Sequence, residues 1–229
     1  MKIGGLQRFS LIDYPENICA IIFTQGCNFR CPYCHNPELS HPGRYEAVIP
    51  EEEIFSFLER RRGKLDAVSI TGGEPTEQGD LIAFIEQVKA MGYLVKIDTN
   101  GSHPEVLKAL VDRKIIDYIA MDVKAPPDKY KDITRATIEP SIIRQSIQII
   151  LKSGLPHEFR TTVVRSQLDK KDIAAIARLI KGADRYVLQK FVPTKVLDQR
   201  FMNEETWSDK EFSSVKKAIG RSAKQIIIR

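Results

Sequence analysis

The chain has 229 residues, of which 42% are apolar and 28% charged, and its 35 basic and 30 acidic residues give a net charge of +5. No apolar run approaches the length of a membrane span and no signal-peptide stretch opens the chain, so we expect a cytoplasmic protein without a membrane partner. The small excess of basic residues is not concentrated in one segment of the chain, which argues against a nucleic-acid partner.

Short apolar runs alternate with longer amphipathic segments along the whole chain. The runs predict strands, and the segments that follow them predict helices. The expected strands are 18–23, 66–71, 94–98, 118–121, 159–164 and 185–188, with a short terminal strand at 225–228. The expected helices are 51–62, 81–91, 104–112, 140–153, 172–180 and 209–219.

This repeated strand–helix order calls for parallel strands joined by right-handed crossovers. The number of units falls short of a closed barrel. We therefore predict an α/β fold, an open partial (β/α)6 barrel with parallel strands, with a flat doubly wound sheet as the alternative. No Ser/Gly-rich linker interrupts the series, so residues 1–229 are expected to form a single domain.

Polar or glycine-rich sequence follows four consecutive predicted strands. A cysteine loop, residues 25–36, follows the first strand and Gly72-Gly73-Glu74-Pro75 the second. Asp98 ends the third strand and Thr99-Asn100-Gly101 follows it, and Asp122-Val123-Lys124 follows the fourth. Because ligands bind at the carboxyl ends of parallel strands, these segments predict one shared binding site.

Three of the four cysteines, Cys27, Cys31 and Cys34, stand within eight residues. In a reducing compartment, clustered cysteines are more often metal ligands than disulfides. Three thiolates are one short of the usual set for an iron–sulfur cube, so they predict a cube with one iron open to a small molecule. The fourth, Cys19, falls inside a predicted strand and is expected to be a buried filler.

Two other interpretations of the cysteine loop are open. A zinc site would need His35 as its fourth ligand, and His35 directly follows Cys34, which is poor for tetrahedral geometry. A thiol redox pair could use Cys31-Pro32-Tyr33-Cys34, but it leaves Cys27 and the motifs after the later strands unexplained.

The spacing Cys27-x₃-Cys31-x₂-Cys34 with its aromatic Tyr33 resembles the signature of the radical S-adenosylmethionine superfamily. The longer stretches 9–15 and 23–37 resemble the glycyl-radical-enzyme activases, and among them the anaerobic ribonucleoside-triphosphate reductase activating proteins. The resemblance is dense over residues 4–40 and returns as short motifs to about residue 190.

The resemblance implies one 4Fe–4S cluster held by the three cysteines, with S-adenosylmethionine on the open iron. It implies reductive cleavage of that cofactor to a 5′-deoxyadenosyl radical, which abstracts the Cα hydrogen of a glycine. The substrate would be a glycyl radical enzyme, and the electron would come from a flavodoxin- or ferredoxin-type donor. The chain lacks cysteines for a second, ferredoxin-like cluster.

The same resemblance implies roles for the residues after the strands. Gly72, Gly73 and Glu74 would bind the methionine ammonium, and Tyr33 would lie near the adenine. Asp98 is a candidate for the ribose hydroxyls, and Thr99 beside it is a candidate cofactor-binding residue. Lys124 is a candidate for the cofactor carboxylate, and Arg160, on the fifth predicted strand, is a candidate to reach the same pocket. Asp98 and Asp122 are also candidates for a monovalent cation.

Two rival functions are open. A radical S-adenosylmethionine enzyme acting on a small metabolite or nucleoside, such as a carboxy-deazaguanine-synthase-like enzyme, would share the cysteine and glycine motifs. An electron carrier or redox sensor would hold a cluster without the cofactor, and it would have no need of residues 72–75 or 122–124.

Overall fold

The computed structural model describes all residues from Met1 to Arg229. It is an α/β fold with one open sheet of eight strands that follow one another in chain order, so β1 and β8 are the edges. The strands are β1 Ile3–Ser10, β2 Cys19–Thr24, β3 Ala67–Gly72, β4 Leu94–Thr99, β5 Tyr118–Asp122, β6 His157–Val163, β7 Ala183–Lys190 and β8 Ala223–Ile228. The helices are α1 Pro37–Ser40, α2 Glu51–Arg60, α3 Leu81–Ala90, α4 Pro104–Asp112, α5 Tyr130–Thr134, α6 Pro140–Lys152, α7 Lys170–Leu179 and α8 Asp209–Ala218. None of these helices combines the length and the hydrophobicity that a membrane-spanning segment requires.

The open α/β sheet expected from the sequence is confirmed, with one correction to the strand directions. The strand β1 pairs antiparallel with β2. The pairs β2–β3, β3–β4, β6–β7 and β7–β8 are parallel. The sequence pattern did not predict β1, because Gly4 and Gly5 and two register irregularities break its alternation.

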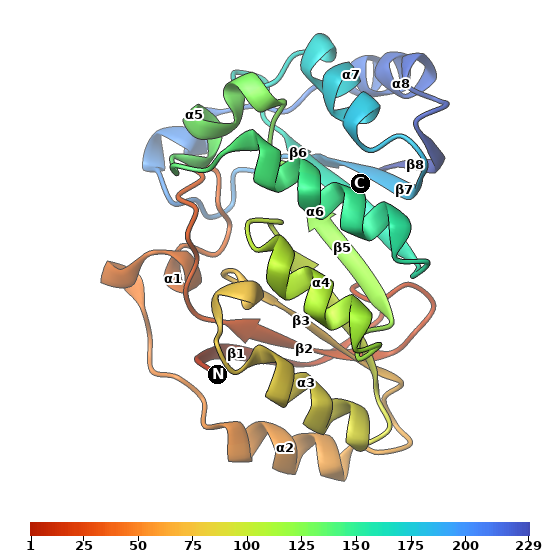
Figure 1. The fold of residues 1–229 in the computed structure, drawn as a ribbon. Helices are drawn as coiled ribbons and strands as arrows, with labels where there is room; N and C mark the ends of the chain where they lie inside the picture. The colour runs from red at the N-terminus through yellow and green to blue at the C-terminus, as the bar shows by residue number, and fades with distance from the viewer. The chain divides into compact units, whose positions relative to one another are not determined.

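The chain forms two compact units, which we describe separately (Figure 1). The first unit comprises Met1–Asn28, Asn36–Thr99 and Glu105–Ile119. Its strands β2, β3 and β4 are parallel and in register, and α3 packs against β4. Four of the five apolar residues of β2, Cys19 to Ile22, are almost fully buried and Phe23 is half-buried, as expected for a strand largely covered on both faces.

The second unit comprises Phe29–His35, Asn100–Pro104 and Ala120–Arg229. Its strands β6, β7 and β8 are parallel, and α7 and α8 lie side by side (Figure 1). Tyr186 of β7 is fully buried, and its hydroxyl contacts the hydroxyl of Thr161 at 3.1 Å. Both helices begin with a capping box, at Asp169 for α7 and at Ser208 for α8.

Candidate functional site

In the first unit, the beginning of the cysteine loop is fixed by the backbone of other elements. The amide of Gln25 donates to the carbonyl of Lys2 at 2.8 Å, and the amide of Gly26 donates to that of Leu39 at 2.8 Å. Gly26 has a φ of +116°, so the chain turns sharply there before the half-buried Cys27. The position of Cys27 within this unit therefore follows from main-chain contacts.

Gly72 and Gly73 let the loop after β3 pack directly against the loop after β2. A Cβ atom at Gly72, where φ is +114°, would lie 2.4 Å from the amide nitrogen of Thr24. A Cβ atom at Gly73 would lie 1.9 Å from the carbonyl oxygen of Gly26. The amide of Gly73 donates to Thr24 at 2.8 Å, and that of Glu74 donates to Gly26 at 2.7 Å. Glycine is thus required here for backbone-to-backbone packing, a reason that the sequence did not reveal.

Glu74 is 1% exposed, and its carboxylate is held by groups of the protein itself. Its Oε1 accepts hydrogen bonds from the amide and hydroxyl of Thr76, and from the hydroxyl of Thr99 at 2.7 Å. On the same strand as Thr99, Asp98 forms an ion pair with the buried ammonium of Lys96. The structure therefore brings Gly72, Glu74 and Thr99 together within the first unit.

In the second unit, the rest of the cysteine loop is anchored to distant parts of the chain. The amide of Arg30 donates to the carbonyl of Thr134, the last residue of α5, at 2.8 Å. The amide of Asp198 donates to the carbonyl of Pro32 at 3.0 Å. Cys31 and Cys34 are joined by a 3.0 Å bond from the amide of Cys34 to the carbonyl of Cys31. These anchors set the local conformation of the two cysteines.

His35 is attached to the segment that follows β7. Its Nε2 donates to the carbonyl of Val192 at 2.9 Å, and its ring stacks on that of Phe191 with centroids 5.6 Å apart and planes 6° apart. Sequence reasoning did not identify Thr134, Phe191 or Val192, because backbone carbonyls and a lone aromatic give no motif. These contacts give His35 a role in holding the loop.

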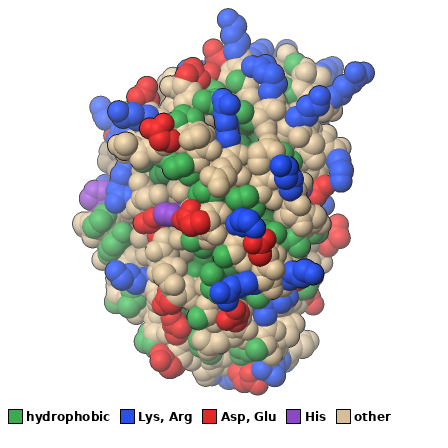
Figure 2. All heavy atoms as spheres, viewed as in Figure 1, with side chains coloured by type: hydrophobic (Ala, Val, Ile, Leu, Met, Phe, Trp, Pro, Cys, Tyr) green, Lys and Arg blue, Asp and Glu red, His purple; other side chains and the backbone are tan.

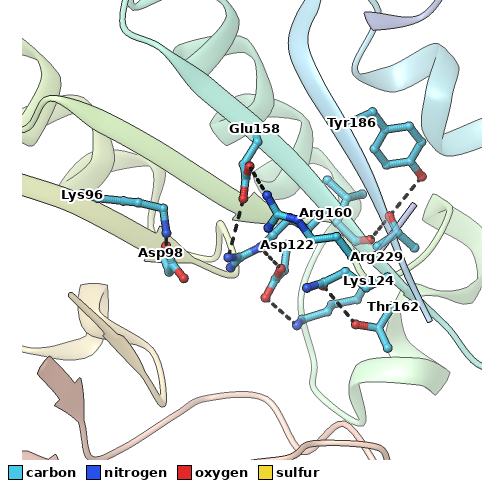
Figure 3. Close-up of polar contacts among 12 residues, drawn as sticks. Lys96, Asp98, Asp122, Lys124, Glu158, Arg160, Thr162, Tyr186 and Arg229 are labelled. Atoms are coloured by element: carbon cyan, nitrogen blue, oxygen red, sulfur yellow. Dashed lines mark hydrogen bonds and ion pairs between the residues drawn. The ribbon is translucent and has the colours of Figure 1, made fainter. Parts of the chain in front are cut away.

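Three sequence-predicted residues form one charge cluster in the second unit (Figure 3). Asp122 accepts from Nζ of Lys124 at 2.9 Å and from Nε of Arg160 at 2.8 Å. Glu158, which is 2% exposed, lies 3.9 Å from the guanidinium groups of both Arg160 and Arg229. The cluster therefore extends from the end of β5 across β6.

The charge states of the cluster follow from these contacts. Burial alone would raise the pKa of Asp122, but Arg160 and Lys124 outweigh it and hold that pKa well below its usual range. Burial alone would lower the pKa of Lys124, but Asp122 outweighs it and raises that pKa well above its usual range. Both groups are therefore charged at neutral pH.

Cys31 and Tyr33 lie within the electrostatic influence of this cluster. Burial raises the pKa of the Cys31 thiol to about 11, while Lys124 opposes the shift. Burial also raises the pKa of Tyr33 well above its usual range, with Cys31 adding to it. Tyr130, which the sequence did not single out, connects the charge cluster to the cysteine loop. Its hydroxyl accepts a hydrogen bond from the amide of Lys124 at 3.4 Å, and its ring packs edge-on against that of Phe29.

The residues of the second unit fit a polar cofactor. The hydroxyl of Tyr33 is buried without a hydrogen-bond partner, which is a costly arrangement in a protein interior. A cofactor group would satisfy it, and the neighbouring Lys124 supplies a cation. No group of three or more His, Cys, Asp or Glu side chains is assembled into a metal site, so Cys27, Cys31 and Cys34 stay a predicted ligand set.

Comparison with known proteins places these features in a family. Residues 21–180 match the model of the radical SAM superfamily. The chain belongs to this superfamily, and its relatives include glycyl-radical-enzyme activases. The family implies a 4Fe–4S cluster and S-adenosylmethionine as cofactors.

Three relatives bear on the kind of enzyme. The chain is 37% identical to a candidate glycyl-radical enzyme activating enzyme of Methanocaldococcus jannaschii, over 99% of this chain and 95% of that protein. It is 32% identical to the pyruvate formate-lyase-activating enzyme of Listeria monocytogenes, over 62% of this chain and 60% of that one. It is 26% identical to the 7-carboxy-7-deazaguanine synthase of Thermococcus kodakarensis, over 77% and 76% of the two chains. The similarity thus identifies a radical SAM enzyme of the activase type.

Solved structures support the fold. The crystal structure of Streptococcus suis SuiB bound to S-adenosylmethionine superposes with a TM-score of 0.68 at 14% identity, covering 91% of this chain and 51% of that one. The chain thus spans about half the length of SuiB. At this identity the likeness concerns the fold alone.

Proposed function

We propose that this chain activates a glycyl radical enzyme, and that the partner is an anaerobic ribonucleotide reductase. The observation that carries the proposal is the similarity over 99% of the chain to a relative named as a glycyl-radical enzyme activating enzyme. The sequence segments around Cys27, Cys31 and Cys34 resemble those of the ribonucleotide reductase activases. This resemblance favours an anaerobic ribonucleotide reductase as the partner.

Cys27, Cys31 and Cys34 would hold a single 4Fe–4S cluster through three irons. When bound together with S-adenosylmethionine and given one electron by a flavodoxin- or ferredoxin-type donor, the cluster would supply reductive cleavage to methionine and a 5′-deoxyadenosyl radical, which would take a glycine Cα hydrogen atom and become 5′-deoxyadenosine. The protein contributes position, charge and exclusion of water. The main-chain anchors of the cysteine loop support the first of these contributions.

The remaining residues would hold S-adenosylmethionine. Lys124 uses one of its three donors on Asp122, which leaves it donors for the cofactor carboxylate. The unpartnered hydroxyl of Tyr33 supports a contact with the adenosine part of the cofactor. Gly72 and Gly73 would accept from the methionine ammonium through their carbonyls. Thr99 and Glu74 fix the shape of that loop.

Asp98 would face the ribose hydroxyls, with Arg160 acting through Asp122. A monovalent cation on Asp98 and Asp122 is the less favoured part of the proposal. Asp122 already has two cationic partners, Arg160 and Lys124, and a bound cation would have to compete with both.

The test is activation of a purified anaerobic ribonucleotide reductase under strictly anoxic conditions. We expect electron paramagnetic resonance to show a stable glycyl radical on the reductase after incubation with the reconstituted protein, reductant and S-adenosylmethionine. The radical should be missing with Cys31→Ala, and with a reductase whose radical glycine is changed to alanine. Radical formation on a pyruvate formate-lyase, and not on the reductase, would overturn the proposed partner. It would still agree with the proposal that the chain activates a glycyl radical enzyme.

A small-molecule substrate is the second candidate, supported by the 26% identity to 7-carboxy-7-deazaguanine synthase over 77% of this chain. The same reactions distinguish it. Formation of 5′-deoxyadenosine that depends on a small metabolite, with no protein partner present, would replace the activase proposal. Absence of any cofactor cleavage would favour the electron carrier.

A further inference from the structure

The C-terminal ends of α7 and α8 enclose a groove in the second unit. The groove has a cavity volume of about 380 Å³ and is lined by both helices and by the residues just after α8. Figure 2 shows Lys and Arg side chains gathered over this part of the surface, at the top right of the view. The volume falls within the range of small-ligand sites, about 300–1,000 Å³. None of the residues used by the proposed function lines it.

Four cations surround the groove, and none is neutralised by the protein. Arg178 and Lys181 come from the end of α7, and Lys217 and Arg221 come from the end of α8. All four side chains are exposed, and no carboxylate lines the groove. Their charge is therefore available to a ligand.

The negative ends of the two helix dipoles balance only part of this positive charge. Cations near a helix C-terminus complement the partial negative charge of the last carbonyls, and two helix ends meet here. Each end carries about −0.5 of an elementary charge. Four cations against two such ends leave an excess of roughly +3. The excess is more than capping requires, and it favours an anion.

Ser222 provides an independent sign of a ligand. It lines the groove and is 8% exposed, and its hydroxyl is buried without a hydrogen-bond partner. Its backbone is fully engaged: the amide donates to Ile219 at 2.9 Å, and the carbonyl accepts from Gly182 at 2.9 Å. The hydroxyl itself has almost no exposed surface, so a rotation about χ1 would bring it to an oxygen bound in the groove, to which it would donate. Nothing in the protein uses this donor.

We propose that this groove binds a small phosphorylated molecule. Phosphate offers several charged acceptor oxygens, which guanidinium groups bind through two parallel hydrogen bonds. Buried Ala177 and Ile219 give the groove an apolar floor for the organic part of such a ligand. The small volume of the groove and the buried serine hydroxyl favour a small molecule over an acidic protein surface.

The experiment is isothermal titration calorimetry on the reconstituted protein saturated with S-adenosylmethionine, with inorganic tripolyphosphate as the probe. We expect Lys217→Glu to weaken binding at least ten-fold, since it reverses a charge at the groove. The matched control is Lys216→Glu, which makes the same charge change at an exposed neighbour outside the lining. Its affinity should stay within about two-fold of the parent, because solvent screens a charge that does not face the ligand.

A second variant tests the serine. Ser222→Ala should weaken tripolyphosphate binding several-fold while keeping the stability of the protein, because it removes a hydroxyl that nothing in the fold uses. Equal effects of Lys217→Glu and Lys216→Glu would mean nonspecific attraction and would overturn the site. Binding of poly-glutamate but not tripolyphosphate, lost in Lys217→Glu, would replace the phosphorylated ligand with an acidic protein. These measurements do not depend on radical formation, so they stand or fall separately from the activase proposal.

Discussion

The hydroxyl of Thr99 donates a 2.7 Å hydrogen bond to Oε1 of Glu74, which joins the end of β4 to the loop after β3. Glu74 is 1% exposed and Thr99 is 3% exposed, so water does not compete for this contact. The bond couples two of the segments that the sequence places at a cofactor. A buried carboxylate that accepts several hydrogen bonds fixes the shape of the loop around it.

Loss of this contact should be measurable as stability. We expect Thr99→Val to lower the free energy of unfolding by about 2 kcal/mol, because it removes one donor from a buried carboxylate. Glu74→Ala should cost more, about 3–4 kcal/mol, since it removes the buried acceptor of three hydrogen bonds, two from Thr76 and one from Thr99. Urea unfolding of the cluster-free protein provides the measurement. Additive effects in the double variant would show that the two side chains are not coupled.

A methyl group at Gly73 should be destructive for a steric reason alone. Its Cβ would lie 1.9 Å from the carbonyl oxygen of Gly26, and a backbone atom cannot move aside easily. We expect Gly73→Ala to destabilise the protein by about 3 kcal/mol or more and to abolish S-adenosylmethionine binding. Gly79→Ala is the control, because no atom lies within 4 Å of its added Cβ. Equal stability of the two variants, measured by urea unfolding, would contradict the packing of the two loops.

The sequence predicted the regular elements well because their periodicity is local. The expected helix 104–112 coincides with α4, and the expected strand 94–98 falls within β4, Leu94–Thr99. The antiparallel β1 was missed because glycines and bulges hide its alternation. Strand irregularities of this kind depend on the partner strand and leave no pattern in a single segment.

The candidate site was predicted as a set of residues but not as a set of contacts. Motifs after the strands identified Gly73, Glu74 and Asp122. They did not show that the carbonyl of Val192 holds His35, a contact between residues 157 positions apart. Main-chain groups are present at every residue, so nothing in the sequence distinguishes the one that makes such a contact.

Asp122 should give the protein a distinct dependence of stability on pH. Its folded-state pKa lies well below the unfolded value, so its contribution is present above the unfolded pKa, near 3.8. The contribution is lost as the pH falls from there through the folded pKa. We expect Asp122→Asn to lower stability by roughly 3 kcal/mol at pH 7, with a difference from the parent that shrinks progressively below about pH 4.

Urea unfolding between pH 3 and 7 checks the effect of Asp122, with Asp112→Asn as the control. Asp112 is 58% exposed and pairs with Lys108 on the surface of α4, so its loss should cost no more than about 0.5 kcal/mol. A difference between Asp122→Asn and the parent that is constant across the pH range would show that the carboxylate charge is not responsible.

The cysteines separate into predicted ligands and a structural residue. We expect alanine at Cys27, Cys31 or Cys34 to abolish cluster assembly, measured as iron and sulfide content and as visible absorbance after anaerobic reconstitution. Cys19 is fully buried in β2, and burial raises the pKa of its thiol to about 11. Cys19→Ala should therefore keep a full cluster while losing about 1–2 kcal/mol of stability from the small cavity. A cluster lost in Cys19→Ala would require a different ligand set.

Tyr33 offers a test that separates folding from cofactor binding. Its hydroxyl is buried and has no partner in the protein, so Tyr33→Phe removes a polar group that the fold leaves unsatisfied. We expect the cluster-free variant to be as stable as the parent or more stable by about 1 kcal/mol. If the hydroxyl serves S-adenosylmethionine, the reconstituted variant should bind the cofactor roughly ten-fold more weakly, since a lost hydrogen bond in a desolvated site costs about 1–1.5 kcal/mol. Urea unfolding gives the first quantity and equilibrium dialysis the second. A clear loss of stability with unchanged cofactor affinity would show instead that the hydroxyl belongs to the fold.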